Sequence, residues 1–325
     1  MTTTIPLTRR SALGSLAWLA AGAAWAQAPA PKFPAKTVTV VVPYSAGGGT
    51  DIVGRLMAQH LSELWGQSVV VDNRTGANGV IGSSFVAKAA PDGHALLLVV
   101  GSHAVNPVLM KSMPYDTLKA FKPITLIASS PTVLVAAANG PFKTLRDVVQ
   151  AAQKEEVGIG YSEGQTRLTG ELIRQAGNLK LTGIAYKGGA PMMVDIIGDH
   201  LPLGLTSVLT VLPHVRSGAL RVVGVAADRR MAIFPDAMVF KEVGMEGVAS
   251  LSWYGLFGPA GLPDTLVAQI NRDLKRVGAE PAVIKQMQDQ GAQIMLTPPE
   301  EFRGFLAAET RKWSGVAQRG GISPE

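Results

Sequence analysis

The run TVTVVVPYSAGGGTD at residues 37–51 joins an apolar, β-branched segment to a loop with three consecutive glycines. Its first part, Thr37–Pro43, predicts a strand that is covered on both faces. Beyond the loop, apolar residues recur at spacings of three and four, which predicts a helix capped by Thr50 or Asp51 and ended by Gly66. The glycines let the backbone approach a ligand closely, and the N–H groups at the helix start suit a carboxylate or a phosphate.

The alternation of strand and helix continues after this helix. Further strands are predicted at Ser68–Asp72 and Ala95–Gly101, with a helix at Val80–Ala90 between them. This order is typical of a parallel sheet flanked by helices. A second glycine loop, residues 76–82, again follows a strand and precedes a helix. Both loops are therefore expected at the carboxyl edge of one sheet, where α/β folds bind ligands.

From Thr132 the pattern starts again, which predicts a second α/β lobe. The strands expected there are Thr132–Ala138, Val157–Tyr161, Leu181–Tyr186, Leu201–Leu205 and Leu220–Ala227. The first helix expected there begins at Thr144, with Asp147 as its capping-box partner. Three more are expected near Thr166–Ala176, Pro191–Ile197 and Val208–Arg216. The last third adds strands at Ser252–Phe257 and Gln293–Leu296 and helices at Pro263–Val277, Ala282–Gln290 and after Thr297, the expected cap of the final helix.

The composition of the 325-residue chain excludes several classes of site. It contains no cysteine, so it has no disulfide framework, no cysteine-ligated metal and no thiol nucleophile. Its 47% hydrophobic and 17% charged residues argue against a disordered chain. The formal net charge of +6 hints at an anionic partner. The basic residues form no stripe interleaved with aromatic residues, so nucleic acid is not expected as a partner.

Residues 1–28 predict an export signal. Arg9 and Arg10 form its basic start, and the uncharged run that follows has about 14 residues, fewer than the roughly 20 of a membrane-spanning helix. Cleavage is expected near Ala26 or Ala28, after export by the twin-arginine or the general secretory route. The mature chain would then have a net charge of +4 and lie in the periplasm, without inserting into the membrane.

A competing function is suggested by Gly160–Gly164, which matches the G-x-S-x-G turn of serine hydrolases around Ser162. An acid and a histidine further along could complete the order of a catalytic triad: Asp195 or Asp199, then His200 or His214. No clear catalytic loop surrounds these residues. A secreted serine hydrolase that uses Ser162 is therefore only the alternative to the main interpretation. Neither glycine loop has a dinucleotide or Walker-type phosphate motif, and the histidines lack metal-ligand spacing. No cofactor and no metal is therefore expected.

Short motifs stand in a defined order from about residue 33 to residue 322. They are Val42–Asp51, Gly66–Arg74, Gly79–Gly82, Ala90–Gly93, Asn106-Pro107, Pro114–Asp116, Tyr186–Pro191, Asp195, Trp253–Leu256 and Gly258–Gly261. In this order and spacing they resemble the periplasmic solute-binding proteins of tripartite tricarboxylate transporters, the Bug-type receptors.

The resemblance implies an α/β fold of two lobes, each a central sheet flanked by helices, that close on a ligand. This is the Venus flytrap architecture of periplasmic binding proteins, in a type II-like form. We expect the chain to cross between the lobes near Ser129–Pro131 and Val248–Ser252. The first lobe would then comprise residues 29–130 plus 250–325, and the second lobe residues 131–249.

The resemblance also implies a non-enzymatic, monomeric receptor that captures a small organic acid and presents it to membrane transporter subunits. The expected first-lobe site is Tyr44, Ser45, Ala46, Gly47, Gly48, Gly49, Thr50 and Asp51, with Asn78, Gly79, Val80, Ile81, Ser102 and His103. The expected second-lobe site is Ser162, Thr166, Arg167, Tyr186, Lys187, Gly188, Gly189, Asp195, Thr206 and Ser207. Asp51 is expected to order its loop, because its charge would repel an anion.

Two departures from the family pattern concern the second lobe. Thr206-Ser207 stand where many relatives have Asp followed by Asn, and a short loop leads to Arg167 where many relatives have a longer loop and a histidine. Losing an acid and gaining a guanidinium would favour a ligand with a second anionic group, unless Arg167 lies on the helix surface. Which carboxylate binds, and whether occupancy serves transport or signalling, stay open.

Overall fold

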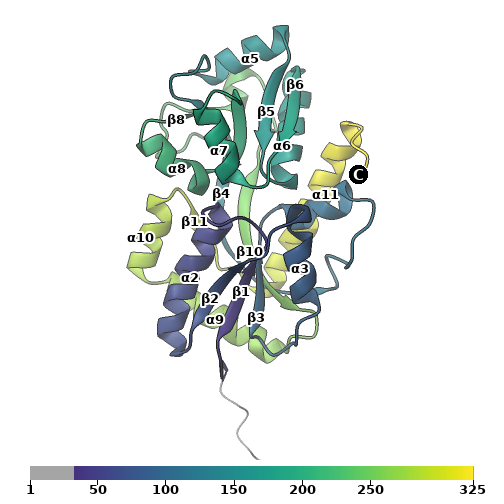
Figure 1. The fold of residues 1–325 in the computed structure, drawn as a ribbon, viewed down its shortest axis with the longest axis vertical. Coiled ribbons are helices and arrows are strands. Elements are labelled where there is room, and N and C mark those ends of the chain that lie inside the picture. The colour runs from purple at the N-terminus through teal and green to yellow at the C-terminus, as the bar shows by residue number, and fades with distance from the viewer. Residues whose placement is uncertain (1–32, 325) are drawn as a thin grey trace, which may run out of the picture. The chain divides into compact units, whose positions relative to one another are not determined.

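The computed structural model describes residues 33–324. From Lys36 onward the chain forms one compact unit, in which Figure 1 shows two α/β parts joined through the long strand β4 (Phe121–Ala137). The expected export signal and its cleavage positions lie outside the described residues. Within residues 33–324, no helix combines the length and the hydrophobicity that a membrane span requires.

The first sheet forms where the opening strand–loop–helix pattern predicts it. Its parallel strands β1 (Val38–Val42), β2 (Val69–Asn73) and β3 (Ala95–Val99) lie in the order β2-β1-β3. The strand β10 (Leu251–Pro259) runs antiparallel between β3 and β4. Because β1, β2 and β3 are parallel, the loops that follow them leave the same edge of the sheet.

A helix follows each of these three strands. They are α2 (Gly49–Trp65), α3 (Val80–Ala87), which is preceded by the 3-10 turn η1 (Ala77–Gly79), and α4 (Ser102–Leu109). The helix α4 was not predicted. It contains Pro107, which has no N–H to donate within a helix.

The strand β4 belongs to two sheets. Its residues up to Pro131 pair with β10 and with the short β11 (Gln293–Ile294), and from Thr132 onward they pair with strands of a second sheet. The chain passes back between the sheets beside this point. There Thr132 N–H donates to Ser250 O (2.9 Å), and the two hydroxyl oxygens lie 3.1 Å apart. Both passages between the sheets are thus hydrogen-bonded to each other.

The second sheet contains the outer half of β4 and five further strands. These are β5 (Val157–Tyr161), β6 (Leu181–Ala185), β7 (Leu203–Ser207), β8 (Leu220–Ala226) and β9 (Met238–Val239). Its order is β4-β7-β5-β6, and β8 pairs with the other side of β4 and with β9. The helices of this part are α5 (Leu145–Lys154), α6 (Gly164–Gly177), α7 (Gly189–Ile197), α8 (Val208–Arg216) and the 3-10 turn η2 (Phe240–Val243).

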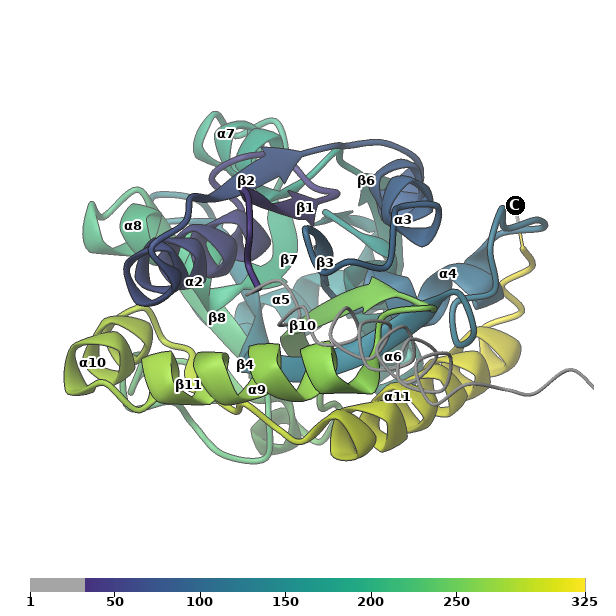
Figure 2. The ribbon, with the colours of Figure 1, turned by 90° about the horizontal axis from the view of Figure 1, so that it is seen from below.

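The C-terminal segment returns to the first sheet. It forms α9 (Asp264–Gly278), α10 (Pro281–Asp289) and α11 (Pro299–Arg319). Both α9 and α11 contact β4, and Figure 2 shows them along the same side of β4 and β10. We call the first sheet with α2–α4 and α9–α11 the first lobe, and the second sheet with α5–α8 the second lobe.

Alternation along β4 explains why the second sheet is covered on both faces. Leu134 and Ala136 belong to one core cluster, whereas Val133, Val135 and Ala137 belong to another. Successive side chains of a strand point to opposite faces, so α5 and α6 can bury one side while α7 and α8 bury the other.

A smaller apolar cluster joins the two lobes, and we call it the seam. It consists of Val105 and Leu109 of α4, Leu168 of α6, and Trp313, Val316 and Ala317 of α11. These residues are at most 6% exposed. The lobes are therefore in contact through buried hydrocarbon as well as through β4.

The α/β class and the placement of most helices and strands are confirmed, but three capping assignments need comment. Gly48, not Thr50 or Asp51, is the N-cap of α2. Pro298, not Thr297, precedes α11, and the Thr297 hydroxyl instead accepts a hydrogen bond from Leu126 N–H (3.2 Å). The capping box of α5 is present as predicted, with Thr144 and Asp147 bonded to each other's backbone N–H groups.

Candidate functional site

The first glycine loop is held in place by Asp51, in the first turn of α2. Its carboxylate accepts hydrogen bonds from Gly47 N–H (3.0 Å), Arg55 Nε (2.9 Å) and Asn73 Nδ2 (3.1 Å). Burial alone would raise the pKa of Asp51, but the hydrogen bonds from these three groups outweigh it and hold the pKa below its usual value. Asn73 also donates to Tyr44 O (3.1 Å), so Asp51 and Asn73 together order the loop.

The second glycine loop reaches the other lobe through Asn78. Ala77 and Asn78 both adopt left-handed backbone angles, with φ of 44° and 51°. The Asn78 side chain donates to Asn106 Oδ1 of α4 (2.6 Å) and accepts from Gly164 N–H (3.2 Å), the first residue of α6. Asn78 thus connects a loop of the first lobe to a helix start in the second.

Glu163 makes the reciprocal connection from the second lobe. It is the N-cap of α6, in a capping box with Thr166, and its Oε2 accepts a hydrogen bond from Ser102 N–H (2.9 Å) at the start of α4. Burial raises the pKa of Glu163 to about 7, although hydrogen bonds from Ser102, Gln165 and Thr166 act against the rise. The Ser102 hydroxyl is also hydrogen-bonded to the Tyr44 hydroxyl.

Between the lobes lies a small cavity of about 60 Å³, the inner cavity. It is lined by Tyr44, Ser45, Gly48, Gly49, Thr50, Val100, Ser162, Glu163, Thr166, Gly188, Gly189, Thr206, Ser207, Thr210, Ser252 and Tyr254. Ten of these sixteen residues carry a hydroxyl group, and Glu163 is the one charged residue among them. Hydroxyl groups can donate hydrogen bonds to a carboxylate without bringing charge into the site.

A larger cavity of about 630 Å³, the outer cavity, adjoins the inner one. Tyr44, Ser45, Ser162, Glu163 and Gly188 line both. The outer cavity is further lined by Pro43, Thr75, Gly76, Ala77, Asn78, Gly79, Leu109, Met110, Tyr161, Gly164, Arg167, Ala185, Tyr186 and Lys187. Three tyrosine rings and two cations thus surround a space of the size that small-molecule ligands occupy.

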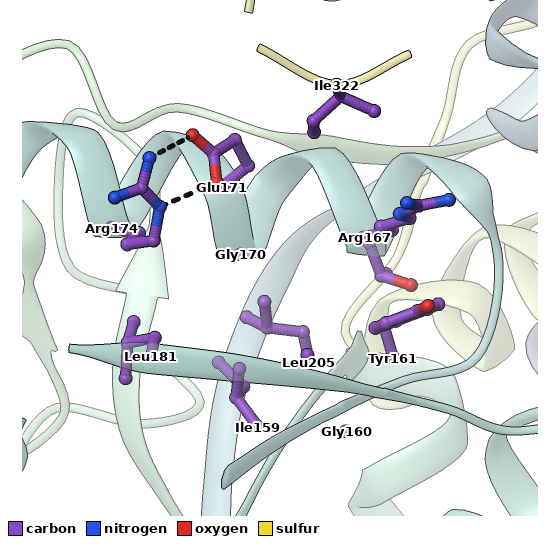
Figure 3. A pocket seen from close by; sticks show the side chains of 12 residues that line it. Ile159, Gly160, Tyr161, Arg167, Gly170, Glu171, Arg174, Leu181, Leu205 and Ile322 are labelled. Atoms are coloured by element: carbon purple, nitrogen blue, oxygen red, sulfur yellow. Dashed lines mark hydrogen bonds and ion pairs between the residues drawn. The ribbon is translucent and has the colours of Figure 1, made fainter. Parts of the chain in front are cut away.

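A third cavity, of about 230 Å³, lies in the second lobe beneath α6. Figure 3 shows Ile159, Leu181 and Leu205 on the strands below it and Ile322 above the helix. Arg174 pairs with Glu171 on its rim, through two hydrogen bonds of 2.7 Å. This cavity shares Tyr161 and Arg167 with the outer cavity, so Arg167 stands at the boundary between them.

Most of the predicted site residues come together at the two connected cavities. The inner cavity collects Tyr44, Ser45, Gly48, Gly49, Thr50, Ser162, Thr166, Gly188, Gly189, Thr206 and Ser207. The outer cavity adds Asn78, Gly79, Arg167, Tyr186 and Lys187.

The remaining predicted residues line neither cavity: Ala46, Gly47, Asp51, Val80, Ile81, Ser102, His103 and Asp195. Ile81 is 56% exposed, and Asp195 accepts a hydrogen bond from Tyr186 Oη (2.6 Å). His103 departs furthest from the prediction. Its ring lies among Tyr115, Phe121 and Phe257, and burial lowers its pKa to about 3, so it is a neutral part of the core.

Four polar residues that line the inner cavity are absent from the predicted site: Glu163, Thr210, Ser252 and Tyr254. Thr210 accepts a hydrogen bond from Gly49 N–H (3.3 Å) across the lobes and lies one turn after Ser207. Ser252 and Tyr254 lie just after the second crossing, in the segment that contains the Trp253–Leu256 motif. The predicted crossing and the neighbouring motif are the sequence features from which these two residues could have been predicted.

The chain is similar to one described protein family, to a known sequence and to solved structures. A family model described as the tripartite tricarboxylate transporter family receptor matches residues 53–322. Protein BugT of Bordetella pertussis is 32% identical over 295 residues, which cover 89% of this chain and 90% of BugT. The structure of Rpa4515 of R. palustris with adipate has a TM-score of 0.87 and 29% identity, over 90% of this chain and 100% of that one. MatC from Rhodopseudomonas palustris with bound malate has a TM-score of 0.82 and 27% identity, over 87% and 99%.

Proposed function

This chain belongs to the family of tripartite tricarboxylate transporter receptors, and on that premise we propose that it captures a small organic acid between its lobes. The observation that carries the proposal is the inner cavity, where the first glycine loop meets Ser162, Thr206 and Ser207 of the second lobe. A ligand there would contact both lobes at once, so it would bind best when they are together.

The proposed ligand is a dicarboxylate, with one carboxylate in the inner cavity and its body in the outer cavity. Adipate and malate, the compounds in two similar structures, are both dicarboxylates. The hydroxyl-rich inner cavity supports the first carboxylate, and Arg167 and Lys187 in the lining of the outer cavity support an anionic second end.

The proposed lobe boundaries are residues 29–130 plus 250–325, and 131–249. They are supported by the change of pairing partners along β4 between Pro131 and Thr132. We further propose that the mature protein is a periplasmic monomer that begins after Ala26 or Ala28. It would present the ligand to membrane transporter subunits, as membership in this family suggests.

The protein is proposed to have no catalytic activity. Among the described residues, no histidine lines either cavity in which Ser162 lies, so a serine–histidine pair at Ser162 has no support. A Ser162→Ala variant should show the same generic esterase background as the wild type, with at most a modest change of ligand affinity. Ester turnover that Ser162→Ala abolishes would contradict the receptor function.

A thermal-shift screen of mono-, di- and tricarboxylates tests the proposed ligand class. A ligand at 100 times its dissociation constant should stabilise the protein by about 2.7 kcal/mol. We expect the largest shifts with dicarboxylates, adipate and malate included. The absence of any shift across the panel would point to another class of ligand.

A further inference from the structure

The carboxyl group of Glu163 has an unusual position for a site that would hold anions. It lines both the inner and the outer cavity. It also caps α6 of the second lobe and accepts the Ser102 N–H of the first lobe (2.9 Å). Any carboxylate that fills both cavities must therefore lie beside it.

The groups that face Glu163 do little to neutralise it. Tyr44 and Tyr254 approach it from the first lobe, and His103, next to Ser102 on α4, is neutral. Lys187 and, on its own helix, Arg167 share the outer cavity with it. Within residues 33–324, neither cation forms an ion pair with Glu163, whose pKa is set by burial and by backbone and hydroxyl hydrogen bonds.

We propose that Glu163 is a proton-binding site coupled to ligand capture, so that the receptor takes up one proton from solvent as a carboxylate fills the cavities. This inference rests on the proposed function, since it requires an anionic ligand. A ligand would displace the water that still reaches the carboxyl group through the cavities, and it would add a negative charge nearby. Both effects disfavour the ionised form of Glu163. The protonated carboxyl group can instead donate a hydrogen bond to the ligand.

The sign of the pH dependence follows from this coupling. An ordinary glutamate has a pKa near 4.5, whereas burial between the lobes raises the pKa of Glu163 to about 7. A bound carboxylate raises that value further. Between the pKa of the free form and that of the complex, affinity falls by up to tenfold for each unit of rising pH. The effect should therefore be visible as the pH rises above 7.

Calorimetry with adipate tests the coupling directly. Binding is measured at pH 8, above the free-state pKa, in two buffers of different ionisation enthalpy, and affinity is measured from pH 6 to pH 9. The wild type should take up most of one proton per adipate and lose affinity as the pH rises above 7. Glu163→Gln keeps an oxygen that can accept the Ser102 N–H, so it should bind adipate without proton uptake and with little pH dependence. Glu155→Gln, the same change on the exposed surface of the second lobe, should behave as wild type.

Adipate binding by the wild type with no proton uptake would overturn the proposal. An infrared difference titration of wild type against Glu163→Gln separates this failure from a failure of the proposed function. Without ligand, the protonated carboxyl band assigned to Glu163 should disappear with a midpoint near pH 7. A midpoint near that of an ordinary glutamate would overturn the proton site, even if carboxylates bind. A midpoint near 7 in a protein that binds no carboxylate would support the titration but overturn the coupling and the proposed ligand class.

Discussion

A methyl group added at position 49 should obstruct the inner cavity. The Cβ of an alanine there would lie 2.8 Å from Ser207 Oγ and 3.1 Å from Tyr254 Cζ, and would also contact the Tyr254 hydroxyl. Tyr254 is 1% exposed, so its ring has little room to move. Overpacking of this kind costs about 1–3 kcal/mol. Ser207 belongs to the second lobe, so the cost falls on the form with the lobes together, which is the form that binds ligand. Gly49→Ala should therefore weaken binding by roughly 5- to 150-fold.

Gly304, on the exposed side of α11, provides a matched control. An alanine Cβ there would meet no atom within 4 Å. Gly304→Ala should therefore change affinity by no more than about twofold, as surface substitutions usually do. Titration calorimetry with adipate measures both variants against the wild type. Wild-type affinity in Gly49→Ala would refute the placement of a ligand carboxylate in the inner cavity.

Three further substitutions test other parts of the structure. Arg167→Ala should weaken adipate binding by roughly tenfold or more, because a charge-assisted hydrogen bond to the second carboxylate is lost. Binding of hexanoate, which has the same chain length but only one carboxylate, should not change. Equal losses for both ligands would show that Arg167 does not contact the second carboxylate. Asp51→Asn should lower the free energy of unfolding by about 1–3 kcal/mol at neutral pH. Because the pKa of Asp51 is lower in the folded state than its ordinary value of 3.8, this difference should shrink as the pH falls below 3.8. Urea titrations at several pH values measure it. Glu309→Ala should lower the free energy of unfolding by about 2–5 kcal/mol, because it leaves the buried indole N–H groups of Trp253 and Trp313 without their acceptor. Glu309→Gln keeps an acceptor oxygen and should recover most of that loss. Thermal melts of both variants and the wild type measure the difference.

The sequence predicts most of the fold because each parallel strand and its following helix form a local pattern. Val157–Tyr161 and Val208–Arg216 have the predicted bounds. The errors occur where tertiary contacts decide the conformation. The first half of β4 was not predicted, because Pro123 and Ser129-Ser130-Pro131 flank its apolar run and disfavour a continuous strand, yet β10 pairs with it along its length. Likewise, Thr297 resembles a helix cap, but its hydroxyl bonds β4 instead.

The predicted glycine loops line the two cavities, whereas several of the predicted single side chains lie elsewhere. The resemblance to a family locates the glycine loops, because those motifs are contiguous. The sequence marks Glu163 only as part of the Gly160–Gly164 turn, because its contact with Ser102 joins segments 61 residues apart. His103 follows a strand at the expected edge, but its ring turns into an aromatic core that no local pattern reveals.

The seam makes the two sides of the lobe interface unequal in how easily they separate. Parting Leu168 from Trp313 and Leu109 would expose hydrocarbon to water, at about 25 cal/mol for each Å². The hydroxyl groups of the inner cavity, in contrast, would exchange one set of hydrogen bonds for another with water. The lobes should therefore separate by rotating about the seam rather than by sliding past each other. The edge formed by α4, α6 and α11 should move least.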